Sequence, residues 1–410
     1  ANSTDAAGSP GGGASVVAAY QINVGPAIPA PLVGWGAGTW GQIGTTWGNS
    51  GTSTTALRIW NQTNYGEDLL YGPRTGGLYY WNATDGVTTR GVLLNSLGGA
   101  VTFSNASPTV VTSTVAYTVG AAIQFSGASL PSGVSASTTY YAYNVEGLTF
   151  NLLDAAGNEI NTSATGSGTV SLIVDVPTVQ NNIVVSDTSR FILTFGCNDY
   201  GQSLIDPMLI RWSNQDDPYN WTPTATNQAG SVRLSHGSEI VTVVQTRQEI
   251  VVFTDSSVYS LQYLGPPYVW GSQLLGDNIS ITGPTAAVIA SGIIYWMGVD
   301  KFYTYDGRVQ TLNCDLRRFV FSDINQEQAL QVFSGTNEGF NEVWWFYCSA
   351  NSTTIDRYVI YNYLERVWYY GTMERTAWLD SGLQAFPIAA KYNSTALTGN
   401  LINHETGLND

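Results

Sequence analysis

The sequence predicts an all-β protein, in which a β-propeller-like platform carries an inserted small β-domain. Charged residues make up only 11% of the chain, whereas roughly 25% is usual in soluble domains. Aromatic residues reach 12%, and Thr, Ser, Val, Tyr and Gly are abundant. These residues suit pleated surfaces and turns, while long solvated helices need exposed Glu, Lys, Arg and Ala. Pairs of apolar segments also recur along the C-terminal part.

The N-terminal part begins with a polar, low-complexity segment, 1–15, that starts with Ala rather than Met. This start and the irregular end at 407–410 favour a trimmed piece of a longer protein. A Trp- and Gly-rich stretch follows at 34–40, and further aromatic or apolar clusters lie at 58–60, 69–71 and 78–81. Glycine turns between such clusters indicate short strands. No run of 18 apolar residues occurs, so we expect no membrane-spanning helix.

A separate module follows, because the composition changes near Ser96. Between Arg90 and Arg190 there is no Lys or Arg, and five acidic residues lie in that interval. Segments 138–143 and 148–152 alternate as half-buried strands do. We therefore expect three parts, which are residues 1–96 with the first propeller strands, an inserted small β-domain over 97–176, and the propeller blades over 177–410.

Paired strands recur after the module. Apolar segments at 191–195, 250–253, 293–296 and 343–347 are each followed by a second one, at 208–212, 258–263, 302–305 and 358–362. From Ile250 to Ile293 is 43 residues and from Ile293 to Trp344 is 51, close to the roughly 40 to 50 residues of a propeller blade. The interval from Ile192 to Ile250 is longer, at 58 residues. Removing 97–176 shortens the interval from Leu69 to Ile192 from 123 to 43 residues.

Local patterns assign further elements within the blades. Segments 250–253 and 293–296 are continuously apolar, which is typical of inner strands that are covered on both faces. Asp306-Gly307 is typical of a hairpin turn. One helix is predicted, with Ser322-Asp323 as its cap and 324–331 as its body.

The charge balance of the chain argues against most classes of nucleic-acid-binding protein. The formal net charge is -15, and Lys301 and Lys391 are the only lysines. Binding to DNA or RNA depends on neutralising phosphates with Lys and Arg. A basic binding face is therefore not expected.

The two histidines of the chain do not predict a hydrolytic site. Ser235, His236 and Glu239 lie close together in sequence, but neighbouring residues at a strand end point in opposite directions, and a triad needs converging side chains. His236 is interpreted as a surface turn residue. His404 lies near the end of the chain, and it is likewise interpreted as a surface residue without a catalytic role.

Two acidic pairs, Glu67/Asp68 and Asp216/Asp217, could in principle act as acid and base on a glycoside. The second pair precedes a proline in a segment rich in Asn, which favours a structural turn. We therefore predict no catalytic residues and no enzyme activity.

Cofactor and metal sites are not predicted either. No phosphate-binding loop is present. The chain has three cysteines, Cys197, Cys314 and Cys348, which are too far apart for a zinc cluster and odd in number, so they are interpreted as reduced core thiols. Exposed aromatics such as 368–370 could stack on sugars, but at this density we expect them in blade cores or subunit interfaces.

Several segments resemble one family. They are 216–221, 245–250, 295–303, 340–347 and 356–362. They lie within the stretch from Arg211 to Asp380. This stretch, with the Trp-rich block before the module, resembles the tail hub, or nozzle, of short-tailed bacteriophages of the podovirus type, also called packaged-DNA stabilisation proteins. The module at 97–176 is similar to small β-domains that decorate the outside of phage tail proteins.

This resemblance implies a structural protein of the virion tail that is assembled in the cytoplasm of the bacterial host. It implies a homohexameric ring below the portal and adaptor, which lines the channel for genome retention and DNA ejection. Tail fibres or spikes and a distal tail needle are the other implied partners, with no membrane and no cofactor. DNA would pass without specific binding, since an acidic bore lets it slide. Few charges and many aromatics also fit large permanent interfaces.

Two alternatives remain open at this point. One is a carbohydrate-binding or glycoside-cleaving β-propeller that serves as a receptor-binding tail protein. The other is a secreted adhesive β-protein, which would be a monomer without affinity for a portal or adaptor.

Overall fold

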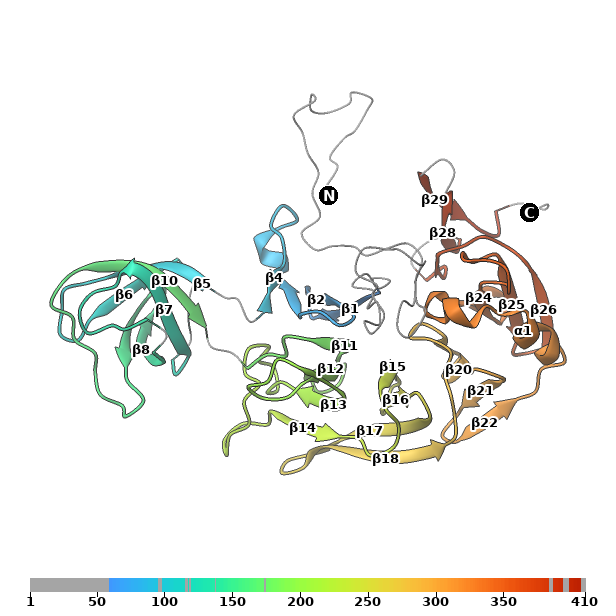
Figure 1. Ribbon diagram of the computed structural model, residues 1–410, viewed down its shortest axis with the longest axis horizontal. Coiled ribbons are helices and arrows are strands. Elements are labelled where there is room, and N and C mark those ends of the chain that lie inside the picture. The colour runs from blue at the N-terminus through green and yellow to red at the C-terminus, as the bar shows by residue number, and fades with distance from the viewer. Residues whose placement is uncertain are drawn as a thin grey trace, which may run out of the picture. The chain divides into compact units, whose positions relative to one another are not determined.

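The structure is a computed structural model that describes residues 59–94, 98–114, 117, 119–136, 138–172, 175–382, 386–393 and 398–406. Its fold is all-β, as the sequence predicts, with the sheets of a β-propeller and a small inserted β-barrel (Figure 1). The chain divides into two compact units, and their described parts lie in Trp60–Arg233 and in Leu234–Asp410. The segments 1–15, 34–40 and 407–410 lie outside the described residues.

The first unit contains two four-stranded antiparallel sheets, each with its strands in sequence order. The strands are β1 (Trp60–Tyr65), β2 (Asp68–Pro73), β3 (Tyr79–Trp81) and β4 (Val92–Leu93), then β11 (Gln180–Val185), β12 (Ile192–Asn198), β13 (Ile205–Trp212) and β14 (Gly230–Arg233), with a short 3-10 helix η1 (Ala83–Asp85) after β3. β1 lies beside β11. Apolar side chains of both sheets, among them Leu70, Ile183 and Ile192, form one core. The strands predicted near 69–71, 78–81, 191–195 and 208–212 are confirmed.

The inserted domain is a closed six-stranded barrel with the strand order β10-β5-β6-β9-β8-β7. Its strands are β5 (Gly98–Phe103), β6 (Val110–Ser113), β7 (Ala122–Ser129), β8 (Tyr140–Glu146), β9 (Thr149–Leu153) and β10 (Gly166–Leu172). Phe103 and Phe125 meet edge to face, 5.0 Å apart, in a core of its own. Closure leaves no sheet edge open. Val176, by contrast, packs into the core of the two blade sheets.

The second unit contains three four-stranded sheets and one sheet with three described strands. The first two sheets consist of β15 (Ile240–Gln245), β16 (Ile250–Thr254), β17 (Ser257–Gly265) and β18 (Val269–Asp277), then β19 (Ala287–Ala290), β20 (Ile293–Met297), β21 (Phe302–Tyr305) and β22 (Val309–Leu312). The other two consist of β23 (Phe333–Asn337), β24 (Glu342–Tyr347), β25 (Arg357–Asn362) and β26 (Val367–Thr372), then β27 (Ala377–Leu379), β28 (Ile388–Asn393) and β29 (Thr398–Asn403). Short helices connect them, which are α1 (Arg317–Asp323), η3 (Gln326–Gln331) and η4 (Glu338–Phe340).

The spacing of the apolar segments in the sequence is the spacing between equivalent positions in successive sheets. Leu69, Ile192, Ile250, Ile293 and Trp344 all lie on the second strand of their own sheet. Their spacing therefore follows the blades, and the described residues contain six blade sheets.

The prediction that 250–253 and 293–296 are strands covered on both faces is confirmed, but they are the second strands of their sheets rather than the first. The first strands of successive sheets in this unit contact one another, β15 with β19 and β19 with β23. β16 is buried along its whole length, whereas three of the four residues of β19 are only partly buried. Continuous apolar sequence therefore marks a strand that has neighbours on both edges and sheets on both faces, which is the second strand of the blade.

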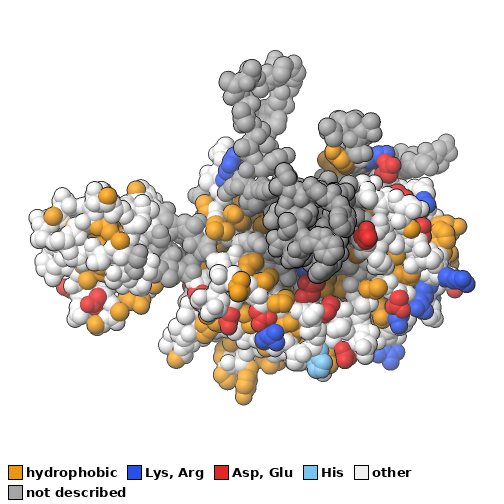
Figure 2. Space-filling view, in the orientation of Figure 1, with side chains coloured by type: hydrophobic (Ala, Val, Ile, Leu, Met, Phe, Trp, Pro, Cys, Tyr) orange, Lys and Arg blue, Asp and Glu red, His pale blue; other side chains and the backbone are white. Residues whose placement is uncertain are grey.

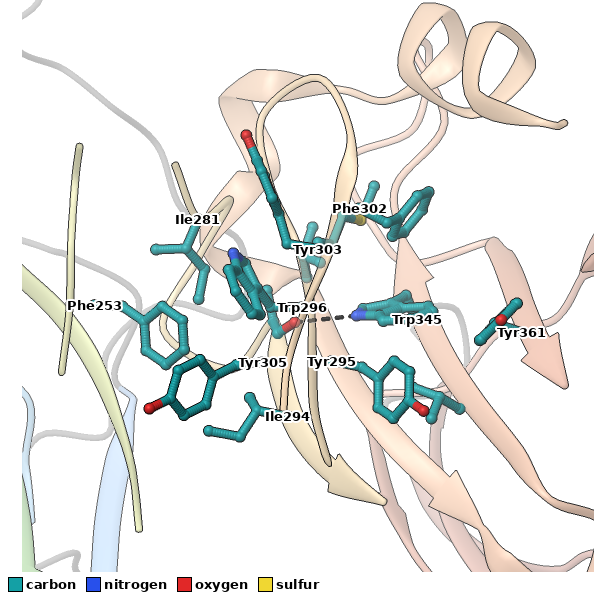
Figure 3. Packing of buried hydrophobic residues seen from close by; sticks show 14 of the residues in the cluster. Phe253, Ile281, Ile294, Tyr295, Trp296, Phe302, Tyr303, Tyr305, Trp345 and Tyr361 are labelled. Atoms are coloured by element: carbon teal, nitrogen blue, oxygen red, sulfur yellow. Dashed lines mark hydrogen bonds between the residues drawn. The ribbon is translucent and has the colours of Figure 1, made fainter. Parts of the chain in front are cut away.

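One apolar core connects the first three sheets of this unit (Figure 3). Trp296 on β20 stacks on Tyr303 at 5.2 Å and meets Phe253 of β16 edge to face at 5.0 Å. Trp345 on β24 packs against Phe302 at 4.9 Å, and its indole N–H donates to the carbonyl of Ala286 at 3.0 Å. Contacts between neighbouring sheets are therefore made largely by the abundant aromatic side chains of this chain.

The hairpin turn predicted at Asp306-Gly307 is confirmed. β21 and β22 pair directly on either side of it, and Gly307 has a φ of 109°, which glycine adopts without a steric penalty. Asp306 accepts two hydrogen bonds from the side-chain amide of Gln310, both at 3.1 Å.

The predicted helix is confirmed in part, because the 3-10 helix η3 lies within the predicted body 324–331, but the predicted cap is wrong. Ser322 and Asp323, which were expected to cap it, form the last turn of α1. Ile324 is extended and forms a bridge with Ser349, so the helix cannot continue through it. A 3-10 helix follows, and the side chain of Asn325 caps it. The pairing partner is distant in sequence, which is why local signals misplaced the boundary.

Cys197 and Cys348 are buried and Cys314 is partly buried, and all three are free thiols. Burial raises the pKa of each thiol to about 12, so each is protonated at neutral pH. The interpretation as reduced core thiols is confirmed for Cys197 and Cys348, while Cys314 lies at the periphery of the core. None of the helices in the described ranges has the length and apolar character needed to cross a membrane.

Candidate functional site

His236 lies in an exposed turn before β15, as predicted. The Ser235 hydroxyl is 3.1 Å from its Nδ1, and its backbone N–H donates to the hydroxyl of Tyr259 at 2.7 Å. The carboxylate that holds this turn is Asp255, which accepts from the backbone and the hydroxyl of Ser238. The contacts of the turn are therefore those of a structural loop.

His404 differs from the expectation for it. The structure buries it to 7% exposure at the end of β29, and its ring lies 4.7 Å from that of Trp378. Arg375 donates from Nε to its Nε2 at 2.9 Å. The interpretation of His404 as a surface residue is therefore wrong, because a contact across 29 positions of sequence gives it a fixed structural partner.

The acidic pairs make separate local contacts. Asp68 accepts from the hydroxyl of Tyr80 and from a backbone N–H of η1, and burial together with this carboxylate raises the pKa of Tyr80. Asp216 pairs with Arg190 at 2.7 Å, while Asp217 accepts from the backbone of Tyr219 at 3.0 Å. Asp216 has a φ of 55°, so the turn predicted for this segment is confirmed.

Within the described ranges, no group of three or more His, Cys, Asp or Glu side chains is placed to hold a metal ion.

A cavity of about 570 Å³ lies in the second unit. It is bordered by the start of β25, the connection from β26 to β27, and parts of β28 and β29. The ionisable side chains that line it are Asp356, Arg357, Glu374, Arg375, Lys391 and His404. This cavity brings one of the two lysines of the chain and one of its two histidines together with two arginines.

The acidic side chains at the cavity are engaged by donors of the protein itself. Asp356 accepts from the backbone and the hydroxyl of Ser349, at 2.8 and 2.7 Å. Glu374 pairs with Lys391 at 2.9 Å. Arg357 contacts Asp323 through Nε at 3.3 Å. The cavity thus has a fixed arrangement of charges, with cations from three different strands or loops.

Sequence reasoning did not identify this cavity. Arg357, Arg375, Lys391 and His404 are separated by up to 47 positions, and none of them lies in a recognisable motif. The available signal was their rarity, since a chain with two lysines and two histidines places one of each here.

Exposed apolar side chains form two further surfaces on the second unit. The first, the β26 patch, consists of Phe319 and Tyr370, which are 43% and 54% exposed and whose rings lie 4.6 Å apart. The second, the hairpin tip between β17 and β18, carries Leu264 at 59% and Tyr268 at 77% exposure. The segment 368–370 was expected in a core or an interface. Its first residue, a Trp, packs in the core, and the two tyrosines are exposed.

Few residues of the chain are charged, but Arg317 and Arg318 are exposed beside Phe319 in α1. Figure 2 shows hydrophobic side chains at many places on the described surface and only scattered charged ones. Surfaces of this kind mark contacts with other macromolecules when the apolar side chains gather in patches.

No protein-family model matches the chain, and no curated protein sequence matches it. Solved structures similar to it include Hsv2 from Kluyveromyces marxianus, with 9% identity, a TM-score of 0.30, and coverage of 65% of this chain and 68% of that one. The CNH domain of AfRom2 has 8% identity and a TM-score of 0.32, with 82% and 90% coverage. Hsv2p from Kluyveromyces lactis has 7% identity and a TM-score of 0.31, with 85% and 97% coverage. Likeness at this level supports no statement about function.

Proposed function

We propose that the chain is a structural protein of a phage tail, the nozzle or hub of a short-tailed bacteriophage. In this role it forms a homohexameric ring below the portal and adaptor, lines the channel through which the genome is ejected, and catalyses no reaction. The proposal rests first on the sequence resemblance of 216–221, 245–250 and 295–303. The structural observation that supports it most is the pair of exposed apolar surfaces on a chain with few charges.

The β26 patch and the hairpin tip support ring assembly because they are different surfaces of one unit. A closed ring needs a head-to-tail interface, in which one surface of each copy meets another surface of the next. Permanent interfaces are also more apolar than ordinary protein surface. Tyr268 and Tyr370 are the large, exposed aromatic side chains that such an interface would cover.

The charge of both units supports passage of DNA without adhesion. Leu234–Asp410 contains 17 acidic and nine basic residues, and Trp60–Arg233 contains 12 acidic and five basic ones. DNA carries about one negative charge per 1.7 Å of its axis. A channel that is built from acidic units repels the duplex and lets it slide.

The partners and location follow from the same proposal. The ring would meet the portal and adaptor on one side, and tail fibres or spikes and the distal needle elsewhere, in the virion tail after assembly in the host cytoplasm. The inserted barrel would decorate the outside of the tail.

The proposal is tested on the purified full chain by analytical ultracentrifugation and negative-stain electron microscopy, together with a binding titration against duplex DNA. We expect rings of six copies and no measurable duplex binding at an ionic strength of about 0.15 M. A chain that stays monomeric and binds duplex tightly under these conditions would contradict the proposal.

Removal of the barrel is expected to leave ring assembly intact. The barrel has its own apolar core, and an independent core allows a domain to fold alone. The deletion should span 98–172 and be closed with a short Gly/Ser linker, so that Val176 stays in the blade core. Ultracentrifugation of the deleted chain gives the result, and failure to form rings would show that the barrel takes part in assembly.

The β26 patch is tested separately by the double substitution Phe319→Ser and Tyr370→Ser. Both side chains are exposed, so the substitutions should leave the fold intact but weaken the ring. If this variant assembled as well as the parent chain, the β26 patch would not be part of the interface.

A further inference from the structure

We propose that the cavity between β25–β26 and β28–β29 is a binding site for a small ligand that carries an oxyanion, a carboxylate or a phosphate group. The site does not depend on the proposed role in the tail. Three cationic side chains, Arg357, Arg375 and Lys391, line the cavity within a unit that is acidic overall. The lining holds these three cations against two carboxylates, Asp356 and Glu374, and an excess of cations in one cavity favours a negatively charged ligand.

The contacts inside the protein leave donors for such a ligand. The guanidinium of Arg357 has five N–H donors and the ammonium of Lys391 has three. Arg357 uses Nε for Asp323, and Lys391 forms one ion pair with Glu374. The other N–H groups of the planar Arg357 guanidinium can donate two parallel hydrogen bonds to one carboxylate or phosphate group.

The position of Arg375 is fixed before any ligand arrives. Its Nε donates to Nε2 of His404 at 2.9 Å, and its Nη1 donates to the carbonyl of Glu374 at 2.8 Å. Nε2 of His404 must be the acceptor here because a guanidinium only donates. His404 is itself buried against Trp378. A cation whose rotamer is already held loses less conformational entropy when it binds a ligand.

The volume of the cavity and its other lining side chains limit the size and the polarity of the ligand. Its volume of about 570 Å³ lies within the roughly 300 to 1,000 Å³ of small-molecule sites. Thr372 and Asn403 supply a hydroxyl and an amide, and Met373 and Ile402 supply apolar contact. This combination fits an acidic group on a small polar body, such as a sugar acid.

The test is isothermal titration calorimetry on the full chain with three probes, which are glucuronate, inorganic phosphate and the neutral methyl glucoside. Binding of glucuronate or phosphate without binding of methyl glucoside is expected, and the comparison of the two anions shows which group the site prefers. Lys391→Gln and Arg375→Gln should each weaken anion binding about tenfold, because hydrogen bonds to charged groups are among the stronger ones. Arg308→Gln is the matched control, since Arg308 is exposed in the loop after β21 and does not line the cavity.

Each outcome decides the proposal. Loss of anion binding in Lys391→Gln with retention in Arg308→Gln supports it, and this holds even if Arg375→Gln disturbs the fold through His404. Equal binding of methyl glucoside, equal weakening by Arg308→Gln, or no anion binding by the parent chain at millimolar concentrations would each overturn it.

Discussion

Replacing Trp296 by Ala is expected to lower the free energy of unfolding by about 3–5 kcal/mol, as for other fully buried aromatic residues. Trp296 has no exposed surface, stacks on Tyr303 and meets Phe253 from the neighbouring sheet. Its indole N–H also donates to the carbonyl of Ser280 at 3.2 Å. The substitution therefore leaves a cavity between two sheets and an acceptor without its donor.

The measurement is chemical unfolding of the parent and variant chains, followed by circular dichroism at a fixed protein concentration. Trp60→Ala serves as the control, because this Trp is 40% exposed and its loss should cost about 1 kcal/mol or less. If the Trp296→Ala substitution lowered the free energy of unfolding by less than about 1 kcal/mol, the packing of β20 against β16 would not be a main source of stability.

Replacing Arg211 by Ala is expected to cost about 2–4 kcal/mol of stability. The Arg211 side chain has no exposed surface and lies over the Tyr200 ring at 3.9 Å. Its guanidinium donates to the carbonyls of Asn198 and Asp175 and lies 3.5 Å from the carboxylate of Asp175. Removing one partner of a buried polar network leaves the others without their hydrogen bonds. Since Asp175 is 28% exposed, water screens part of that loss.

Arg233→Ala provides a close comparison in the same sheet. Arg233 also pairs with an aspartate, Asp206, at 2.7 Å, but its side chain is 60% exposed. Exposed ion pairs contribute about 0–1 kcal/mol, so this variant should unfold almost like the parent chain. Equal losses in the two arginine variants would show that burial is not what makes Arg211 important.

Local sequence patterns predicted the strands well because the pattern of apolar residues follows from burial. In the blade with β15–β18, the apolar run from Ile250 to Phe253 is a strand that the structure buries completely. Turn chemistry was equally local, as at Gly307, where a positive φ is needed. Such features depend on a few consecutive residues, and a sequence shows them directly.

Other features depend on contacts between distant residues. Ile324 ends α1 because it pairs with Ser349, and His404 is buried because Trp378 and Arg375 reach it. The order of strands within a blade also depended on such contacts, since the apolar run at 250–253 belongs to the second strand rather than the first. No local pattern records these partners.

The sequence by itself determined that the chain is built of sheets, that an acidic module without cations interrupts the blades, and that acidic residues outnumber basic ones in both units. These properties follow from composition and from periods of a few residues. The tertiary structure alone decided that the module closes into a barrel and that Arg357, Arg375, Lys391 and His404 surround one cavity. The physical reason is that closure and convergence arise from pairing between strands that are far apart in the chain, where each contact is fixed by packing.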